Sequence, residues 1–147
     1  MSRPGFTLVE SVVALVIIGV LLTFALPRFK DWLPRESLRA ARRELTTQLA
    51  RARATAVYRG CRAVLHLDDR TSAVWVTACP VLGAGVDTVG TVDSFLDGFG
   101  VSFQADGDSV PFTPQGIALA ASSIAVTLSK GDYSASLEIT PVGRAVW

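Results

Sequence analysis

The sequence has few of the residues that build catalytic and metal sites: its 147 residues include one histidine and two cysteines. A zinc site draws on about four Cys, His or carboxylate ligands, and His66 has no such set beside it. Neither a nucleophile with a base nor a glycine-rich phosphate loop can be recognised. The sequence therefore predicts no catalytic residue, no metal site and no cofactor. Cys61 and Cys79 allow one disulfide.

Two acidic pairs offer the carboxylates that calcium sites use, but they lack the ligand spacing of a calcium loop. Asp68-Asp69 and Asp106-Gly107-Asp108 combine the residue types that favour turns. We interpret both as turns.

One long hydrophobic run accounts for much of the chain's 50% hydrophobic content. Residues 6–26 contain a single charge, Glu10, and Pro27 follows them. As a helix, this run would measure about 31 Å, just enough to cross the hydrocarbon core of a bilayer. The run predicts a transmembrane helix.

The residues before the run differ from an ordinary secretory signal, whose cleavage site follows its apolar core. Here the order is reversed, because Gly5 and Phe6 stand at the start of the run. Residues 5–10, Gly-Phe-Thr-Leu-Val-Glu, resemble the processing site of the type IV prepilin family. The resemblance implies that prepilin peptidase cleaves between Gly5 and Phe6, that Phe6 is N-methylated, and that the helix is retained.

Glu10 should cost several kcal/mol among aliphatic side chains unless its carboxylate is protonated or paired. The prepilin resemblance implies an assembly role, in which Glu10 pairs with the freed amine of Phe6 on a neighbouring subunit. The alternative is a carboxylate that only reaches the membrane interface.

Charge is distributed unevenly along the chain. Residues 28–62 hold ten Lys/Arg and three Asp/Glu, whereas residues 63–147 hold three Lys/Arg and nine Asp/Glu. Taken alone, the positive-inside rule would leave the region after the hydrophobic run in the cytoplasm. The resemblance implies the opposite: a single-pass protein in inner-membrane lipid, its head in the periplasm or otherwise outside the cytoplasmic membrane, before it joins a filament. Copies could pair by charge complementarity.

The segment beyond Pro34 has apolar residues spaced by three or four, as one face of a helix requires. We expect a helix over residues 35–59, continuing from the hydrophobic run and ending at Gly60. Its apolar stripe should pack on the head, while Arg35, Arg39 and Arg43 line another face. The stripe consists of Leu38, Ala41, Leu45, Leu49, Ala52 and Ala56.

From Cys61 the period changes to two, which indicates a β-hairpin with strands over residues 61–67 and 72–79. This arrangement places Leu65 close to opposite Trp75 and Cys61 close to opposite Cys79. The spacing leaves open a disulfide or two buried free thiols. Residues 80–98 read as a loop. Further strands are expected over residues 99–105, 110–113, 117–121, 124–129, 133–140 and 144–147.

Residues 45–60, Phe112-Thr-Pro-Gln-Gly116 and Gly143-Arg144 together resemble the GspH/FimT family of H-type minor pseudopilins and related minor pilins. The resemblance implies an α+β fold, with a long N-terminal helix packed on a small antiparallel β-sheet or β-sandwich. The expected regions are a leader at 1–5, an assembly helix at 6–27, an amphipathic basic helix at 28–60 and a head at 61–147.

The resemblance also implies the function: a structural subunit that partners other pilin-type subunits and initiates or tips a type II secretion pseudopilus or a type IV pilus. One alternative is a DNA-binding minor pilin for natural transformation, with Arg144 as the contact. DNA-binding members resemble Gly-Arg-x-Arg there, and this chain lacks the second arginine. Another alternative is a membrane-anchored domain that never assembles.

Overall fold

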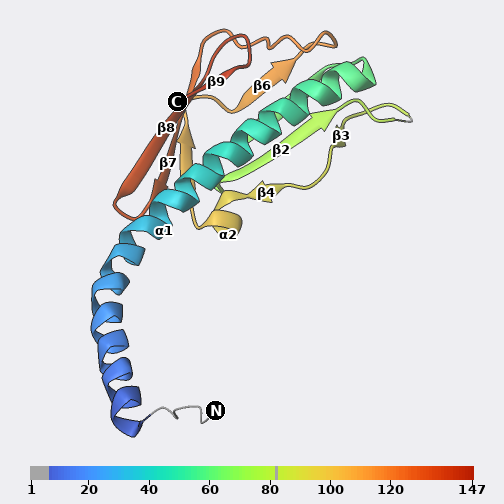
Figure 1. The fold of residues 1–147 in the computed structure, drawn as a ribbon. Helices are drawn as coiled ribbons and strands as arrows, with labels where there is room; N and C mark the ends of the chain where they lie inside the picture. Colours follow the sequence, from blue (N-terminus) through green and yellow to red (C-terminus); the bar gives the residue numbers. More distant parts are fainter. Residues whose placement is uncertain (1–6, 82) are drawn as a thin grey trace. The chain divides into compact units, whose positions relative to one another are not determined.

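The structure, a computed structural model, describes the backbone of residues 7–81 and 83–147, and their side chains except those of residues 24–31. The chain divides into two compact units, residues 1–34 and 35–147. Helix α1, Leu8–Arg59, contributes to both units (Figure 1). The remaining elements all belong to the second unit.

The second half of α1 confirms the predicted apolar stripe. All six stripe residues are buried in the core, whereas Arg35, Arg39 and Arg43 are exposed. The helix ends where predicted because Gly60 adopts a left-handed conformation, with φ of 62°. The backbone N–H of Gly60 donates to Val57 O at 3.3 Å, and that of Cys61 donates to Ala56 O at 3.2 Å. These two bonds satisfy carbonyls that the last helical turn leaves unpaired.

Two antiparallel sheets make up the head. The first has the order β3-β2-β1-β6, with β4 also pairing with β2, and the second has the order β5-β7-β8-β9. The strands are β1 (Ala63–Asp68), β2 (Ala73–Ala78), β3 (Asp87–Thr88), β4 (Asp93–Ser94), β5 (Ser102–Ala105), β6 (Ser109–Phe112), β7 (Ile124–Lys130), β8 (Tyr133–Ile139) and β9 (Ala145–Val146).

One hydrophobic core joins the helix to both sheets, since its buried residues come from α1, from β1 and β2, and from β7 and β8. Figure 1 shows the second half of α1 running along the strands. Burial alternates along β1 because successive side chains point to opposite faces of a sheet. The α+β prediction, a helix packed on antiparallel sheets, is confirmed.

The predicted hairpin is confirmed, and Leu65 and Trp75 lie one residue from being directly opposite. Leu65 pairs with Val76, and Trp75 pairs with His66. Buried Leu65 faces the core, whereas half-buried Trp75 stands on the opposite face of the sheet. A one-residue shift therefore exchanges the two faces of a strand.

The loop predicted over residues 80–98 contains β3, β4 and most of a short helix, α2 (Phe95–Phe99). The side chain of Ser94 caps α2 by accepting a hydrogen bond from the backbone N–H of Asp97 at 3.2 Å. Phe95 is fully buried against Phe103, with ring centroids 5.6 Å apart. Burial of this aromatic ring stabilises the folded segment, whereas its glycine content had suggested a loop.

Two further strand predictions were wrong in part or whole. The strand expected from residue 99 begins at Ser102, because Phe99 ends α2 and Gly100 adopts φ of 61°. Residues 117–121 form no named strand; a single bridge joins Ala118 to Phe112. One bridged pair is too few to define a strand, so this segment is irregular.

Candidate assembly site

The start of α1 coincides with the N-terminal sequence motif. Thr7 precedes the helix, and its Oγ1 accepts a hydrogen bond from the backbone N–H of Glu10 at 3.3 Å. Its carbonyl accepts from the N–H of Ser11 at 3.2 Å. A threonine followed three residues later by a glutamate is the signature of a capping box, and that signal predicts the helix start. The motif was interpreted only for processing and assembly, so the capping role of Thr7 was missed.

Glu10 lies on a segment whose side chains are exposed throughout residues 7–23. The neighbouring apolar residues are exposed as well, with Leu8 at 81% and Val13 at 51%. Among the residues whose side chains are described, no helical segment is long and apolar enough to cross a membrane. Gly5 and Phe6, the predicted cleavage and methylation residues, lie outside the described residues.

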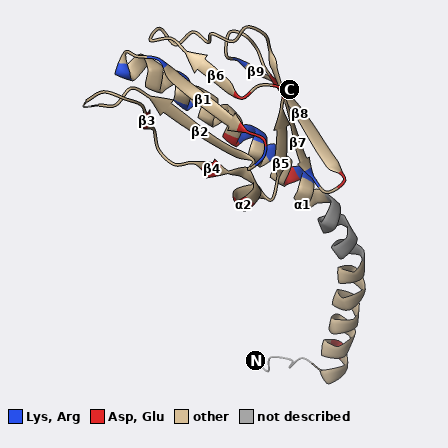
Figure 2. Ribbon diagram, turned by 180° about the vertical axis from the view of Figure 1, so that it is seen from behind, with Lys and Arg blue, Asp and Glu red and all other residues tan. Residues whose placement is uncertain are grey.

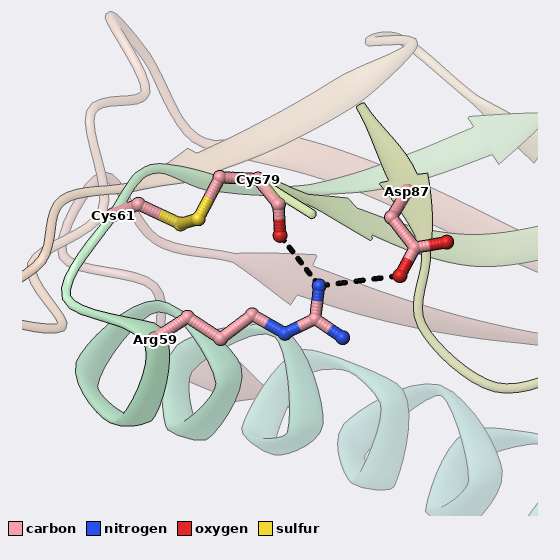
Figure 3. A network of polar contacts seen from close by, with 4 residues as sticks. All are labelled: Arg59, Cys61, Cys79 and Asp87. Atoms are coloured by element: carbon pink, nitrogen blue, oxygen red, sulfur yellow. Dashed lines mark hydrogen bonds and ion pairs between the residues drawn. A yellow bond between two sulfur atoms is a disulfide. The ribbon is translucent and has the colours of Figure 1, made fainter. Parts of the chain in front are cut away.

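Cys61 and Cys79 form a disulfide where the helix passes into the hairpin. Of the two alternatives left open by their spacing, the structure therefore has the bridge. Figure 3 shows Arg59 beside it: its Nη1 donates to Cys79 O at 2.5 Å and lies 3.4 Å from Oδ2 of Asp87. The end of the helix is held to β2 and β3 by one covalent bond and one guanidinium group.

Arg53 connects the helix to the two motif segments of the head. Its Nη2 donates to the carbonyls of Val142 and Gly143 at 2.8 and 2.9 Å. Its guanidinium stands 5.6 Å from the ring centroid of Phe112. A Cβ at Gly116 would lie 3.2 Å from Arg53 Cγ, so this glycine lets the motif loop approach the helix. The motifs at residues 112–116 and 143–144 therefore both contact Arg53 of α1.

Arg144 follows this contact, and its side chain is exposed. Its backbone is fixed, because its N–H donates to Thr140 Oγ1 at 3.1 Å and its carbonyl accepts from Thr140 N at 2.8 Å. The side chain of Arg144 is therefore presented to solvent from an ordered turn.

His66 has a structural environment. Its ring stacks on Trp75 with centroids 5.0 Å apart, and its Nε2 lies 2.8 Å from Thr77 Oγ1. Partial burial lowers the pKa of His66, which favours its neutral form. Across the described part of the chain, no three His, Cys, Asp or Glu residues gather to hold a metal ion.

Comparison with known proteins agrees with these features. Residues 1–26 match the prokaryotic N-terminal methylation motif, and residues 41–143 match the type II transport protein GspH. No curated protein matches the chain.

Two crystal forms of the type IV minor pilin FimU from Pseudomonas aeruginosa PAO1 share the fold. The first, in space group P21, has a TM-score of 0.56 at 19% identity and covers 76% of this chain and 88% of FimU. The second, in space group P65, has a TM-score of 0.54 at 19% identity and covers 74% and 90%. The fold is therefore pilin-like, as the motifs implied. Because the GspH match spans most of the head and the second half of the helix, the chain belongs to the GspH family of type II transport proteins.

Proposed function

We propose that this protein is a minor pseudopilin or minor pilin that initiates or tips the filament of a type II secretion system or a type IV pilus. The GspH family supports the general role of a structural pilin-type subunit. The proposal adds the position of that subunit at the start or end of a filament.

One observation carries the proposal: the methylation motif at residues 1–26 is followed in the same chain by a GspH match over residues 41–143. We infer that prepilin peptidase cleaves between Gly5 and Phe6, and that Phe6 is then methylated. The retained helix holds the protein in the inner membrane, with the head outside the cytoplasm. Lipid, and later neighbouring subunits, would cover apolar side chains such as Leu8, which is 81% exposed in the single chain.

Glu10 supplies the assembly step. A carboxylate surrounded by lipid is costly, and the charge is stabilised once an ammonium group approaches it. In a filament, the freed amine of Phe6 on an adjacent subunit would provide that group. Pairing would then favour the assembled helix over the helix alone in lipid.

The test replaces Glu10→Gln in the full chain, with Ser11→Ala as a control on the next residue. We expect the variant to remain in the membrane while its amount in sheared filaments falls at least about tenfold, because one partner of a buried ion pair is lost. The Ser11→Ala variant should assemble normally. Quantitative immunoblots of membrane and filament fractions measure both amounts. Normal assembly of the Glu10→Gln variant would contradict the assembly role of Glu10, whereas absence of the wild-type chain from filaments would favour an anchored domain that never assembles.

A DNA-binding minor pilin is the alternative function. The exposed side chain of Arg144 is the feature that favours it. Against it, residues 63–147 carry nine acidic and three basic residues, which weakens attraction to phosphate. We therefore place DNA second among the partners.

A further inference from the structure

We propose that an arginine cleft at the start of the second unit binds the phosphate of an anionic lipid headgroup, such as that of phosphatidylglycerol. The arginine cleft is lined by Arg35, Leu38, Arg39, Arg42 and residues 133–135, and its volume is about 360 Å³. Ligand pockets measure about 300–1,000 Å³, so this cleft suits a small polar group. The inference rests on the proposed function, because the retained helix brings this part of the chain to the membrane.

Helix α1 gathers the three arginines of the cleft. Residues spaced by three or four lie on one helix face, so neighbouring turns present Arg35, Arg39 and Arg42 together. Figure 2 shows the basic residues gathered along this half of α1. A guanidinium group can donate two parallel N–H bonds to the oxygens of a phosphate. The cleft therefore offers the side chains that recognise phosphate best.

Contacts with β8 hold two of these arginines and leave donors unused. The guanidinium of Arg35 stands 5.2 Å from the ring centroid of Tyr133, a contact that does not use its N–H donors. Arg42 Nη2 donates to Ser136 O at 2.6 Å, and its buried Nε has no hydrogen-bond partner among the described residues. Since each arginine has five N–H donors, both side chains are positioned and still have donors for a ligand.

Carboxylates compensate the charge of the cleft only weakly. Arg39 lies 3.5 Å from Glu36, but the two side chains are 65% and 38% exposed, and such pairs contribute little. Asp132 at the hairpin turn and Glu138 on β8 are exposed, and neither joins an ion pair among the described residues. The cleft therefore keeps a net positive charge, which favours an anionic lipid over a zwitterionic one.

The position of the cleft in the sequence brings it to the predicted membrane surface. Trp32 follows the hydrophobic run, and it is 55% exposed. Tryptophan is enriched at the headgroup level of bilayers. Arg35 and Arg39 follow Trp32 by three and seven positions, which a helix covers in about 5 and 10 Å. Because side chains tilt toward the N-terminus of a helix, both guanidinium groups extend back toward the headgroups.

The proposal also accounts for charges that the positive-inside rule leaves unexplained. Residues 28–43 hold six Lys/Arg and two Asp/Glu, and the proposed function places them outside the cytoplasm. Lipid phosphates would neutralise these charges there. Duplex DNA is a less suitable phosphate ligand, because it would also face residues 63–147, with nine acidic and three basic residues.

The test counts lipids bound to the full chain in neutral detergent micelles that contain equal amounts of phosphatidylglycerol and phosphatidylcholine. Native mass spectrometry measures the ratio of the two lipids retained. We expect the wild-type chain to retain phosphatidylglycerol at least about fivefold over phosphatidylcholine, because basic residues attract anionic headgroups. Arg35→Gln with Arg39→Gln should bring this ratio to about one. Both side chains are exposed, so the fold should persist.

A matched control replaces two exposed arginines of α1 outside the cleft, Arg43→Gln with Arg51→Gln, and should keep the wild-type ratio. A wild-type ratio near one overturns the proposal, as do equal losses in the cleft and control variants. Displacement of phosphatidylglycerol by an equal concentration of inorganic phosphate would also overturn it, and would assign the cleft to free phosphate.

Two further measurements separate the alternatives. If the cleft variant keeps the wild-type lipid ratio but loses retention on duplex DNA, the cleft binds nucleic acid and the proposal is wrong. The proposed function is scored separately, by the amount of wild-type chain in sheared filaments. A chain that enters filaments without preferring phosphatidylglycerol contradicts the lipid site alone, whereas one that prefers this lipid but never enters filaments contradicts the filament role alone.

Discussion

The two halves of α1 use apolar residues in opposite ways. In residues 8–23 they are nearly consecutive and point to every side, and all of these side chains are exposed. In residues 35–59 they recur every three or four positions, and the stripe that results is buried in the head. The spacing of the apolar residues, rather than their number, therefore decides whether their side chains are buried by the same chain or left exposed to other molecules.

The largest difference between the halves should appear on truncation of a leucine. We expect Leu45→Ala to lower the free energy of unfolding by about 2–5 kcal/mol, because it leaves a cavity in a core where Leu45 is 2% exposed. Leu15→Ala, at a residue 68% exposed, should change that free energy by less than about 0.5 kcal/mol. Urea unfolding of the full chain in neutral detergent, followed by tryptophan fluorescence, measures both. Equal effects would mean that the halves do not differ in packing.

Loss of the disulfide should have the second-largest effect on the free energy of unfolding. Replacing Cys61 and Cys79 together by serine should cost about 3 kcal/mol, because the bridge closes a loop across a sequence separation of 18. Reduction of the wild-type chain should shift its urea midpoint equally, and adding reductant to the double variant should change nothing. A wild-type midpoint insensitive to reduction would show that Arg59 alone secures the end of the helix.

The contact of Arg53 with the C-terminal turn is tested through two glycines in left-handed conformations. A Cβ at Gly143, with φ of 73°, would lie 2.7 Å from Phe112 Cε1, whereas a Cβ at Gly131, with φ of 57°, meets nothing within 4 Å. Gly143→Ala should therefore cost about 1–3 kcal/mol more than Gly131→Ala, the excess being steric. Equal losses in urea unfolding would indicate that only backbone conformation matters at Gly143.

The smallest effect concerns the charges of the two regions. We expect Arg144→Ala to alter retention on duplex DNA by less than about twofold at low salt, because the surrounding head is acidic. Any retention of the full chain in neutral detergent should fall more with Arg43→Ala on the basic stem. A steep, salt-dependent loss confined to Arg144→Ala would instead favour the DNA-binding function.

Local patterns predicted the helix better than the sheet connections. The stripe from Leu38 to Ala56 and the stop at Gly60 depend on neighbouring residues along one helix, and both are confirmed. The register of the hairpin depends on its turn, where Ser72 takes φ of 51° and its buried Oγ accepts the N–H of Phe103 at 3.2 Å. That bond links residues far apart in sequence, so no local pattern could reveal it.

The site was predicted in the same uneven way. The motif from Gly5 to Glu10 is contiguous and could be recognised directly, and the capping role of Thr7 follows from the same residues. The meeting of Arg53 with Gly143 could not be found, because one long side chain reaches backbone carbonyls on a distant turn. The short strands β3 and β4 were missed because two-residue strands exist only through pairing with β2.

The bridge between Cys61 and Cys79 also offers a test of the proposed location of the head. Thiols in a reducing cytoplasm stay unpaired, whereas an oxidising compartment outside it allows them to join. A head retained inside would thus keep two thiols open to alkylation, and an exported head would block both. If the head is exported as proposed, the proportion of chains that resist alkylation counts the subunits whose heads have crossed the membrane.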